Sequence, residues 1–594
     1  MAALTPAPRL APLILMMVVA SGLALHEVYL ARAGAHAVYM DTLRLLWQLS
    51  EFQLGRLPLV ELWGHSGGPH SGLVFQAVLA ANVSWFGLDP LLANRLTGLV
   101  MAMVALLLCG GYIKDSRRAG TSPPILRFSL FIAATTVLCF SLSGFEVLTL
   151  DLGLGLWLKN LLIFVLFFAH ARTLRGDREP TLAWVSSVSA YGVFVVLVCA
   201  MGWSYAVVGA IVGVQVLHHG AARTWPTAKQ AALPLALVCA LVAATLGKRW
   251  YFGDGGHQGG SAFELDSLRQ WLLSLASTFM NGETSARLGI SPALLLALGA
   301  LLAAGIGVAT VVRVLDRRAP LVPVHLMAYA SLCALSFVMA RGGAGDDAVM
   351  ASRYHMDLFP GLVGILWVAS SPMQAPLKLP AWVMPGAFFG LVGLLAGFQA
   401  RQASVEWSAA PYRKAALSAM NEALLAGVPN EAAANLLQSP MPDARRAVAV
   451  MRQQRLGVFR NAPQQPVAAT SCATEWVRRE GWHAGEAGGS WSSARAGFEV
   501  PACPCRYEVA LYIPESFEAR TVAITRTGGT APTNVLALEP GKTVLLSIPA
   551  AAAPHRYQLV SSETTIPARE GINDDTRELG VLMGQPQAIC DTGR

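Results

Sequence analysis

Long apolar runs separated by short polar segments dominate the first 400 residues. A helix needs about 20 consecutive apolar residues to cross the hydrocarbon core of a bilayer, and eleven runs approach that length. They lie near residues 11–30, 95–113, 126–144, 152–171, 183–200, 203–218, 231–247, 290–312, 321–340, 355–371 and 381–399. The pattern predicts an α-helical polytopic membrane protein with about eleven transmembrane helices.

A further apolar run, 73–86, is short for a span, and the basic residues indicate how it lies. If it lies along the membrane, four basic groups fall on one side, which the positive-inside rule identifies as the cytoplasm. These groups are Lys114/Arg117/Arg118, Arg172/Arg175/Arg178, Arg223/Lys229 and Arg313/Arg317/Arg318. The first loop, 31–94, and everything after residue 400 then face outward. The alternative, in which 73–86 crosses the membrane, places either Asp41 or the C-terminal cysteines in the cytoplasm.

The pattern changes after residue 400. Residues 401–461 are rich in Ala, Arg and Glu with helical spacing, and 462–470 have the composition of a linker. Short alternating runs such as RYEVALYI and RTVAITRTGG follow, which is typical of strands. We therefore expect a transmembrane domain over 1–400, a helical connector over 401–461 and an extracytoplasmic β-sandwich over 471–594.

Composition agrees with a membrane protein and excludes several functional classes. Of the 594 residues, 54% are hydrophobic and 13% are charged, whereas soluble chains carry about 25% charged residues. The net charge of +8 suits basic loops beside an anionic membrane surface. No basic patch interleaved with aromatic residues suggests nucleic acid as a partner. The lack of a P-loop, an HExxH and a GxSxG motif argues against a nucleotide-driven pump and the standard soluble hydrolases.

Four of the nine cysteines lie in the polar C-terminal part, at Cys472, Cys503, Cys505 and Cys590. Their presence predicts disulfides and an oxidising compartment, although four cysteines allow three pairings. Because Cys503 and Cys505 are too close in sequence for an easy mutual bond, one or both should pair with Cys472 or Cys590.

The first outer loop carries an acid and two histidines close to the membrane. Asp41 can act as a general base toward an acceptor hydroxyl or bind a divalent metal; alternatively, it is the N-cap of the helix that follows. His65 and His70 enclose a Gly-Gly-Pro turn, and their spacing is not that of a helical zinc pair. They can contact a phosphate or a sugar hydroxyl, or they are ordinary interfacial histidines.

A later segment, next to the fourth predicted span, carries further candidate residues. Glu146 and Asp151 lie at the outer end of an apolar run, and Lys159 follows inside the next span. Charges at membrane depth are costly and indicate function by default, the alternative being that Lys159 forms an ion pair with an acid and holds two spans together.

The segment RGGAGDDAVMASRYHMD places basic and aromatic residues at an outer membrane surface, with Arg341, Arg353, Tyr354 and His355 as candidates. Arginine binds phosphate oxygens with two parallel hydrogen bonds. The alternative is interfacial anchoring by Arg and Tyr.

The order of these features resembles the GT-C superfamily of integral-membrane glycosyltransferases, over roughly residues 10–400. More closely, it resembles bacterial GT-C-like proteins of unassigned substrate. The residues that carry the resemblance are Asp41, Gly55, Leu62, His65, His70, Phe86-Gly87, Glu146, Gly202-Trp203 and Ser352-Arg353-Tyr354. The resemblance implies a catalytic Asp41 in the first outer loop, juxtamembrane helices at 42–53 and 73–86, and a polyprenyl-phosphate-linked sugar as donor.

The C-terminal part resembles the β-sandwich appended to several bacterial surface-glycan proteins. GWHAGEAGGSWSSARAGFEVP and GINDDTRELGVLM carry this likeness, with Trp482, Trp491 and Arg577 at the matching places. It implies a carbohydrate-binding-like jelly roll whose aromatic residues stack on sugars. Core packing is the alternative for the two tryptophans, and Asp575 with Arg577 is interpreted as a structural pair.

Taken together, the residues and the resemblance predict an inverting glycosyltransferase in the bacterial cytoplasmic membrane. Asp41 would deprotonate a glycan or lipid-linked acceptor, and Arg353, with His355 or Arg341, would hold the donor phosphate. GT-C enzymes differ in their use of a divalent metal ion, so the cofactor is left open. The main alternative is a non-catalytic membrane partner of glycan assembly or export with a glycan-binding domain; a transporter is a third reading.

Overall fold

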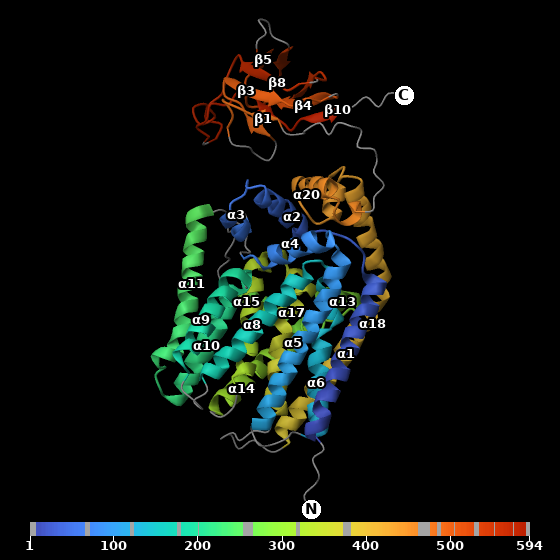
Figure 1. Cartoon of the computed structure of the whole chain (residues 1–594), viewed down its shortest axis with the longest axis vertical. Helices are drawn as coiled ribbons and strands as arrows, with labels where there is room; N and C mark the ends of the chain where they lie inside the picture. Colours follow the sequence, from blue (N-terminus) through green and yellow to red (C-terminus); the bar gives the residue numbers. More distant parts are fainter. Residues whose placement is uncertain are drawn as a thin grey trace, which may run out of the picture. The chain divides into compact units, whose positions relative to one another are not determined.

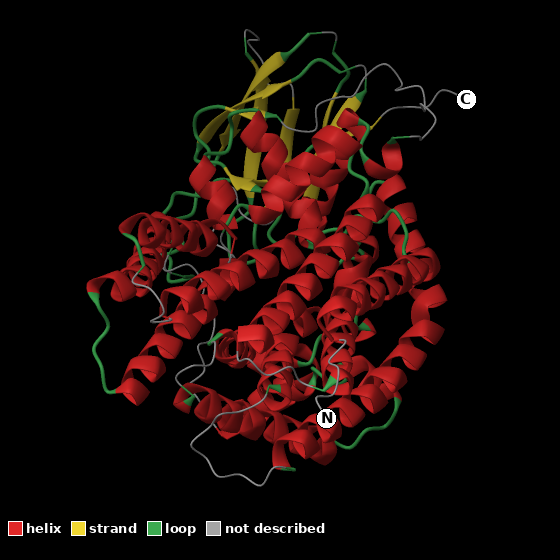
Figure 2. Ribbon diagram, turned by 60° about the horizontal axis from the view of Figure 1, so that its bottom comes forward, coloured by secondary structure: helices red, strands yellow, loops and turns green. Residues whose placement is uncertain are grey.

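The computed structural model describes residues 7–65, 72–118, 124–174, 180–199, 201–252, 265–316, 321–371, 382–460, 476–483, 489–503, 505–527, 534–551, 553–573 and 575–589. The chain divides into two compact units, Met1–Asn461 and Ala462–Arg594. The first is helical and the second consists of strands and loops (Figures 1 and 2). Each unit is described by itself.

In the part of the chain that the structure describes, ten helical stretches are long and apolar enough to cross a membrane. They match ten of the predicted spans. Their helices are α1 (Ala7–Ala33), α5 (Pro90–Arg118), α6 (Ile125–Cys139) continued by η2 (Leu142–Gly144) and α7 (Phe145–Thr149), α8 (Gly153–Leu174), α9 (Leu182–Phe194) continued by η3 (Val195–Cys199), α10 (Ser204–Ala222), α11 (Ala228–Phe252), α14 (Pro292–Leu315), α15 (Val322–Arg341) and α18 (Val383–Leu425).

The remaining predicted span, 355–371, differs from the expectation. It forms α17 (His355–Ser370), which has 16 residues and falls short of the other ten in length. Every residue of α17 is buried, because α15, α14, α6 and α18 pack around it. By length, α17 is therefore not counted among the candidate spans, and the predicted total of eleven stays a prediction.

Short helices follow the first span, where the sequence predicted juxtamembrane helices. These are α2 (Asp41–Gln53), α3 (Leu59–Gly64) and α4 (Val74–Phe86), and α4 packs on both α2 and α8. With 13 residues, α4 is too short to count as a candidate span. It ends at Gly87, which adopts a left-handed conformation with φ 63°, a backbone geometry that glycine adopts without steric cost.

The helical connector is continuous with the last span. Helix α18 runs through residue 400, so the predicted domain boundary there falls inside one helix. Beyond it, α19 (Glu431–Leu436) and α20 (Met441–Gln454) return to α2. The amide of Met40 donates to the Leu437 carbonyl at 2.8 Å, and the Trp47 indole donates to Asp443 at 3.1 Å. The connector thus lies at the same end of the helical unit as the first loop.

The second unit contains two antiparallel sheets. The first has strand order β1-β3-β8-β5-β6, and in the second β10-β4-β9-β2 are joined by β7, which pairs with β4. The strands are β1 (Val477–Arg478), β2 (Ser490–Trp491), β3 (Arg495–Val500), β4 (Arg506–Tyr512), β5 (Arg520–Arg526), β6 (Asn534–Leu538), β7 (Thr543–Ile548), β8 (His555–Ser561), β9 (Leu582–Met583) and β10 (Gln587–Ile589). Alternating buried and exposed positions, clearest in β3 and β4, place one face of each sheet in a shared hydrophobic cluster. The jelly-roll assignment stays a prediction.

The two tryptophans that could stack on sugars are engaged within this unit. Trp491 is buried and packs against Phe517 with ring centroids 5.6 Å apart. Trp482 is half-buried and donates to the Gly497 carbonyl at 2.7 Å. Core packing, the alternative weighed for both, accounts for these contacts. Arg577 pairs with Asp575 at 2.7 Å, which agrees with the expected structural pair.

The cysteines of the two units differ in state. The cysteines of the helical unit are free thiols, whereas Cys503 and Cys505 are disulfide-bonded. Cys472 and Cys590 lie outside the described residues, so the proposed pairing stays a prediction.

An ion pair lies deep in the helical unit between α8 and α17. Lys159 and Asp357 are both inaccessible to solvent, and the Lys159 Nζ lies 2.7 Å from the Asp357 Oδ1. The Tyr329 hydroxyl of α15 donates to the same oxygen at 2.7 Å. The Lys159 ammonium also lies 3.6 Å from the ring centroid of Trp203, within the range of a cation–π contact. The alternative interpretation of Lys159, an ion pair that holds two spans together, matches this geometry.

Removing one partner of this pair should destabilise the protein more than removing both. We expect Lys159→Met to lower the free energy of unfolding by about 3–5 kcal/mol, because it leaves a buried carboxylate without its cation. Lys159→Met/Asp357→Leu should recover most of that loss, since apolar replacement of a buried pair is often close to neutral. Thermal unfolding of the detergent-solubilised protein measures both.

The exposed pair Arg56–Glu51 provides the control, and Arg56→Met should change stability by at most about 1 kcal/mol. Equal destabilisation by the single and double variants would contradict this account of the pair.

Candidate functional site

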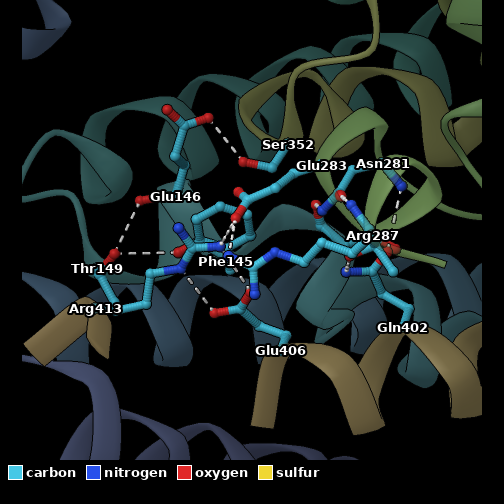
Figure 3. Close-up of polar contacts among 12 residues, drawn as sticks. Phe145, Glu146, Thr149, Asn281, Glu283, Arg287, Ser352, Gln402, Glu406 and Arg413 are labelled. Carbon is cyan, nitrogen blue, oxygen red and sulfur yellow. Dashed lines mark hydrogen bonds and ion pairs between the residues drawn. The ribbon is translucent and has the colours of Figure 1, made fainter. Parts of the chain in front are cut away.

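A polar cluster forms where the segment after α6 meets the N-terminus of α17. Glu146 of α7 accepts a hydrogen bond from the Ser352 hydroxyl at 2.7 Å. The same carboxylate accepts from the Arg353 Nη1 at 3.2 Å and from the Arg353 amide at 3.3 Å. Ser352 and Arg353 lie in η6 (Ser352–Tyr354), a single turn that leads directly into α17. Figure 3 shows Glu146 directed at Ser352. The Arg353 and Glu146 side chains are 30% and 25% exposed, so the pair is open to a ligand.

The first loop docks on this cluster through two residues that flank Asp41. The Thr42 hydroxyl donates to the Asp151 carboxylate at 2.8 Å. Tyr39 is buried, hydrogen-bonds with Thr149, and lies within electrostatic range of Glu146, Asp151 and Arg353. Burial, followed by the charges of Glu146 and Asp151, raises the pKa of the Tyr39 hydroxyl, which therefore stays protonated. Segments about 110 residues apart thus share one site.

Asp151 has the most strongly perturbed carboxyl in this site. It is 5% exposed, and burial raises its pKa to about 7, against the opposing effect of hydrogen bonds from Thr42 and from the Leu152 amide. A general base works best when its pKa lies near the operating pH. Asp151, a candidate residue from the sequence, is thus a carboxyl group whose charge changes near neutral pH.

The Asp41 carboxylate pairs with a residue of its own helix. Asp41 is the first residue of α2, follows Met40, and is 53% exposed. Its carboxylate pairs with Arg44 at 3.0 Å, one helical turn along. The alternative prediction was that Asp41 is the N-cap of this helix. Asp41 does lie at the start of the helix, but the N-cap position is occupied by Met40, with φ 56°. The accessible carboxylate remains available to a molecule that approaches from solvent.

A second acidic cluster, which the sequence analysis did not identify, lies beside the first. Arg413 of α18 donates to Glu283 at 2.7 Å and to Glu406 at 3.1 and 3.2 Å. The Tyr29 hydroxyl donates to Glu406 at 2.8 Å. The Arg413 guanidinium lies 3.9 Å from the ring centroid of Phe145, the residue before Glu146 (Figure 3). Glu406 and Arg413 lie seven residues apart in a helical pattern, which places them on one helix face. This spacing is the sequence feature from which the pair could have been predicted.

His65 takes a structural position. It is 3% exposed, and its Nε2 lies 2.7 Å from the Gln76 side-chain nitrogen. Because that amide nitrogen donates, the Nε2 must accept and the ring proton is assigned to Nδ1. Gln76 also donates to the Leu62 carbonyl at 2.9 Å, so this pair joins α3 to α4. His70 lies outside the described residues.

The late basic segment contributes one of its four candidates to the cluster around Glu146. Tyr354 stacks on Phe337 with ring centroids 3.9 Å apart. His355 is buried, and its Nε2 lies 3.0 Å from the Leu138 carbonyl. Arg341 is exposed at the end of α15. Arg353 thus contacts the carboxylate, while Tyr354 and His355 secure the first turn of α17.

Within the described ranges, no group of three or more His, Cys, Asp and Glu side chains is placed to hold a metal ion. Comparisons with protein-family models, with curated proteins and with solved structures find no match. The GT-C resemblance therefore stays a hypothesis that rests on the residues of this chain. The role proposed below for each site residue is argued from its contacts in the structure.

The raised pKa of Asp151 predicts how stability changes with pH. The ordinary pKa of an aspartate is 3.8, and the folded value is about 7. Protonation is therefore favoured in the folded state, and this contribution is fully present below about pH 4. It is lost as the pH rises through about 7. Relative to Asp151→Asn, the wild-type protein should lose on the order of 4 kcal/mol across this window.

Unfolding midpoints of both proteins between pH 4 and pH 8 measure the effect. The asparagine variant keeps an oxygen that can accept from Thr42, so it serves as the matched reference. A difference between the two proteins that stays constant across the window would contradict the assignment.

Proposed function

We propose that this protein is a GT-C-type glycosyltransferase of the bacterial cytoplasmic membrane. It transfers a sugar from a polyprenyl-phosphate donor to a surface-glycan acceptor on the outer face. The observation that carries the proposal is the docking of the first loop on the Glu146–Arg353 cluster through Tyr39 and Thr42. This docking brings Asp41, the acid between them, to the edge of a site that holds an arginine for phosphate.

Asp41 is assigned as the general base because its carboxylate is accessible to a large acceptor. It takes the proton of the acceptor hydroxyl while the oxygen attacks the anomeric carbon of the donor. The bond between that carbon and the phosphate oxygen breaks, and its electron pair leaves with the phosphate. The displacement is a single step, so it inverts the configuration at the anomeric carbon. Asp151, buried behind Thr42 and with a pKa of about 7, is the competing candidate for the base.

Arg353 is assigned to the donor phosphate. Glu146 accepts from its Nη1 and from its backbone amide, which fixes the position of the guanidinium at the start of α17. A charge-assisted hydrogen bond from arginine stabilises a phosphate, and it strengthens as the leaving group gains charge. Glu146 thus acts as a positioning residue for Arg353.

Two substitutions separate the base from the phosphate contact. Asp41→Asn should lower sugar transfer by about 10²–10⁴-fold, the usual contribution of a general base, with donor binding nearly unchanged. Arg353→Ala should weaken donor binding as well, because it removes a charge-assisted contact. Binding of a polyprenyl-phosphate sugar to the purified protein and single-turnover transfer measure the two effects.

Asp151→Asn is the comparison variant. If it abolishes transfer while Asp41→Asn does not, the base is Asp151. Full biological effect of an Asp41→Ala protein would instead favour the non-catalytic partner of glycan assembly or export. Arg455→Gln, at an exposed arginine of the connector, controls for a general loss of positive charge.

The orientation of the protein in the membrane has its own test. We expect Asp41 and the C-terminal unit on the outer face, because the basic loops fall on the other side. Cysteines at the exposed positions Gln53 and Lys542 should react with a membrane-impermeant maleimide in intact cells. A cysteine at Thr224, in a basic loop, should react after permeabilisation. Protection of either outer position in intact cells would contradict the orientation.

A further inference from the structure

An apolar groove runs along one face of α18. It has a volume of about 600 Å³ and opens between this helix and the segment around α13 (Gly282–Arg287). Its lining residues are Met280, Leu288, Ile290, Phe389, Gly390, Gly393, Leu394, Gly397, Phe398 and Arg401. The α18 members recur at intervals of three and four, so they form one helix face. Arg401 is the charged residue of the lining.

The floor of the groove is made by glycines. A Cβ atom added at Gly390, Gly393 or Gly397 would meet nothing within 4 Å. The space above these residues is therefore open, in contrast to Gly299, where an added Cβ would meet the Leu272 backbone at 2.0 Å. A groove of this kind accepts a slender chain lying lengthwise on the helix.

The length of the groove fits one leaflet of a bilayer. Arg401 lies twelve residues after Phe389, which is about 18 Å along a helix. Half of a hydrocarbon core of ~30 Å is about 15 Å. Arg401 is also eighteen residues beyond Val383, where α18 begins, or about 27 Å. It therefore falls at the membrane surface, at the level of lipid headgroups.

The charge at this end is uncompensated. Arg401 is exposed, and no hydrogen bond or ion pair with another described residue engages its guanidinium. Arginine at the membrane surface attracts anionic headgroups, and its planar donors match phosphate oxygens. An apolar groove that ends in such an arginine is complementary to a lipid with an acyl chain and a negatively charged phosphate.

We propose that this groove binds an anionic phospholipid of the surrounding membrane. One acyl chain lies over Gly390, Gly393 and Gly397, and the phosphate pairs with Arg401. The leaflet-length match favours an ordinary acyl chain over a much longer polyprenyl chain. This site is separate from the proposed donor contact at Arg353 and does not depend on the proposed transferase activity.

The groove is connected to the acidic cluster through α13. Met280 lines the groove, and the backbone amide of the next residue, Asn281, donates to the Gln402 side-chain oxygen at 3.3 Å. Gln402 follows Arg401 and also donates to Thr284 at 2.7 Å. Glu283, in the same short helix, pairs with Arg413. A lipid in the groove therefore supports the helix that presents Glu283.

The test uses the full-length protein, delipidated in detergent and then supplied with defined lipids. Native mass spectrometry should show one phosphatidylglycerol retained about five- to tenfold better than phosphatidylcholine. Arg401→Gln should remove that preference while some binding of both lipids remains. Gly393→Leu, which fills the floor of the groove, should abolish retention of either lipid.

Two controls separate loss of the site from loss of the fold. Gly307→Leu introduces the same side chain on α14 at a glycine with equally open surroundings, and Arg455→Gln removes an exposed arginine of the connector. Both should retain phosphatidylglycerol like the wild type, with unfolding midpoints similar to those of the test variants.

Three results would overturn the proposal. They are equal retention of the two lipids by the wild type, unchanged binding by Gly393→Leu, and retention of polyprenyl phosphate with no phosphatidylglycerol bound. None of these results bears on the effects expected for Asp41→Asn and Arg353→Ala on sugar transfer.

Discussion

The ion pair between Lys159 and Asp357 fixes the helix on which the candidate site depends. Asp357 lies four residues after Arg353, or about one turn. Lys159 and Tyr329 both bind the Asp357 carboxylate, so the depth of α17 between its neighbours is set by polar contacts from α8 and α15. A buried charge without its partner is costly, and sliding α17 by a turn would create two such charges. The position of Ser352 and Arg353 against Glu146 follows from this constraint.

The three carboxylates near the start of α17 differ in solvent exposure and in hydrogen-bond partners. Asp41 is half-exposed beside Arg44, Glu146 is held by Ser352 and Arg353, and Asp151 is buried behind Thr42. Because burial raises the pKa of Asp151 to about 7, the site holds one acid whose charge changes near neutral pH. Groups with different environments can take different roles in one reaction. This arrangement is consistent with the proposed proton transfer beside the proposed phosphate contact of Arg353.

The first loop is held in place from two sides. Helix α20 packs on α2, where Trp47 donates to Asp443, and Met40 donates to Leu437 at the end of α19, while α4 packs on α2 from within the helical unit. The loop that carries Asp41 is thus part of a packed layer. The connector after residue 400, which the sequence predicted to be helical, completes that layer and also supplies Arg413 to the second acidic cluster.

The sequence by itself determined the membrane class, ten of the described spans, the short length of the 73–86 helix and a C-terminal region of antiparallel strands. These features depend on hydropathy and periodicity, which are properties of neighbouring residues. It also named Glu146, Asp151 and Arg353, because charged residues near apolar spans are uncommon. Only the tertiary structure decided that α17 is enclosed by other helices and that Tyr354 and His355 turn inward. Likewise, the partner of Lys159 lies 198 residues away and that of Tyr29 lies 377 residues away. Such pairs are set by which helix faces pack together, and no local pattern of residues records that choice.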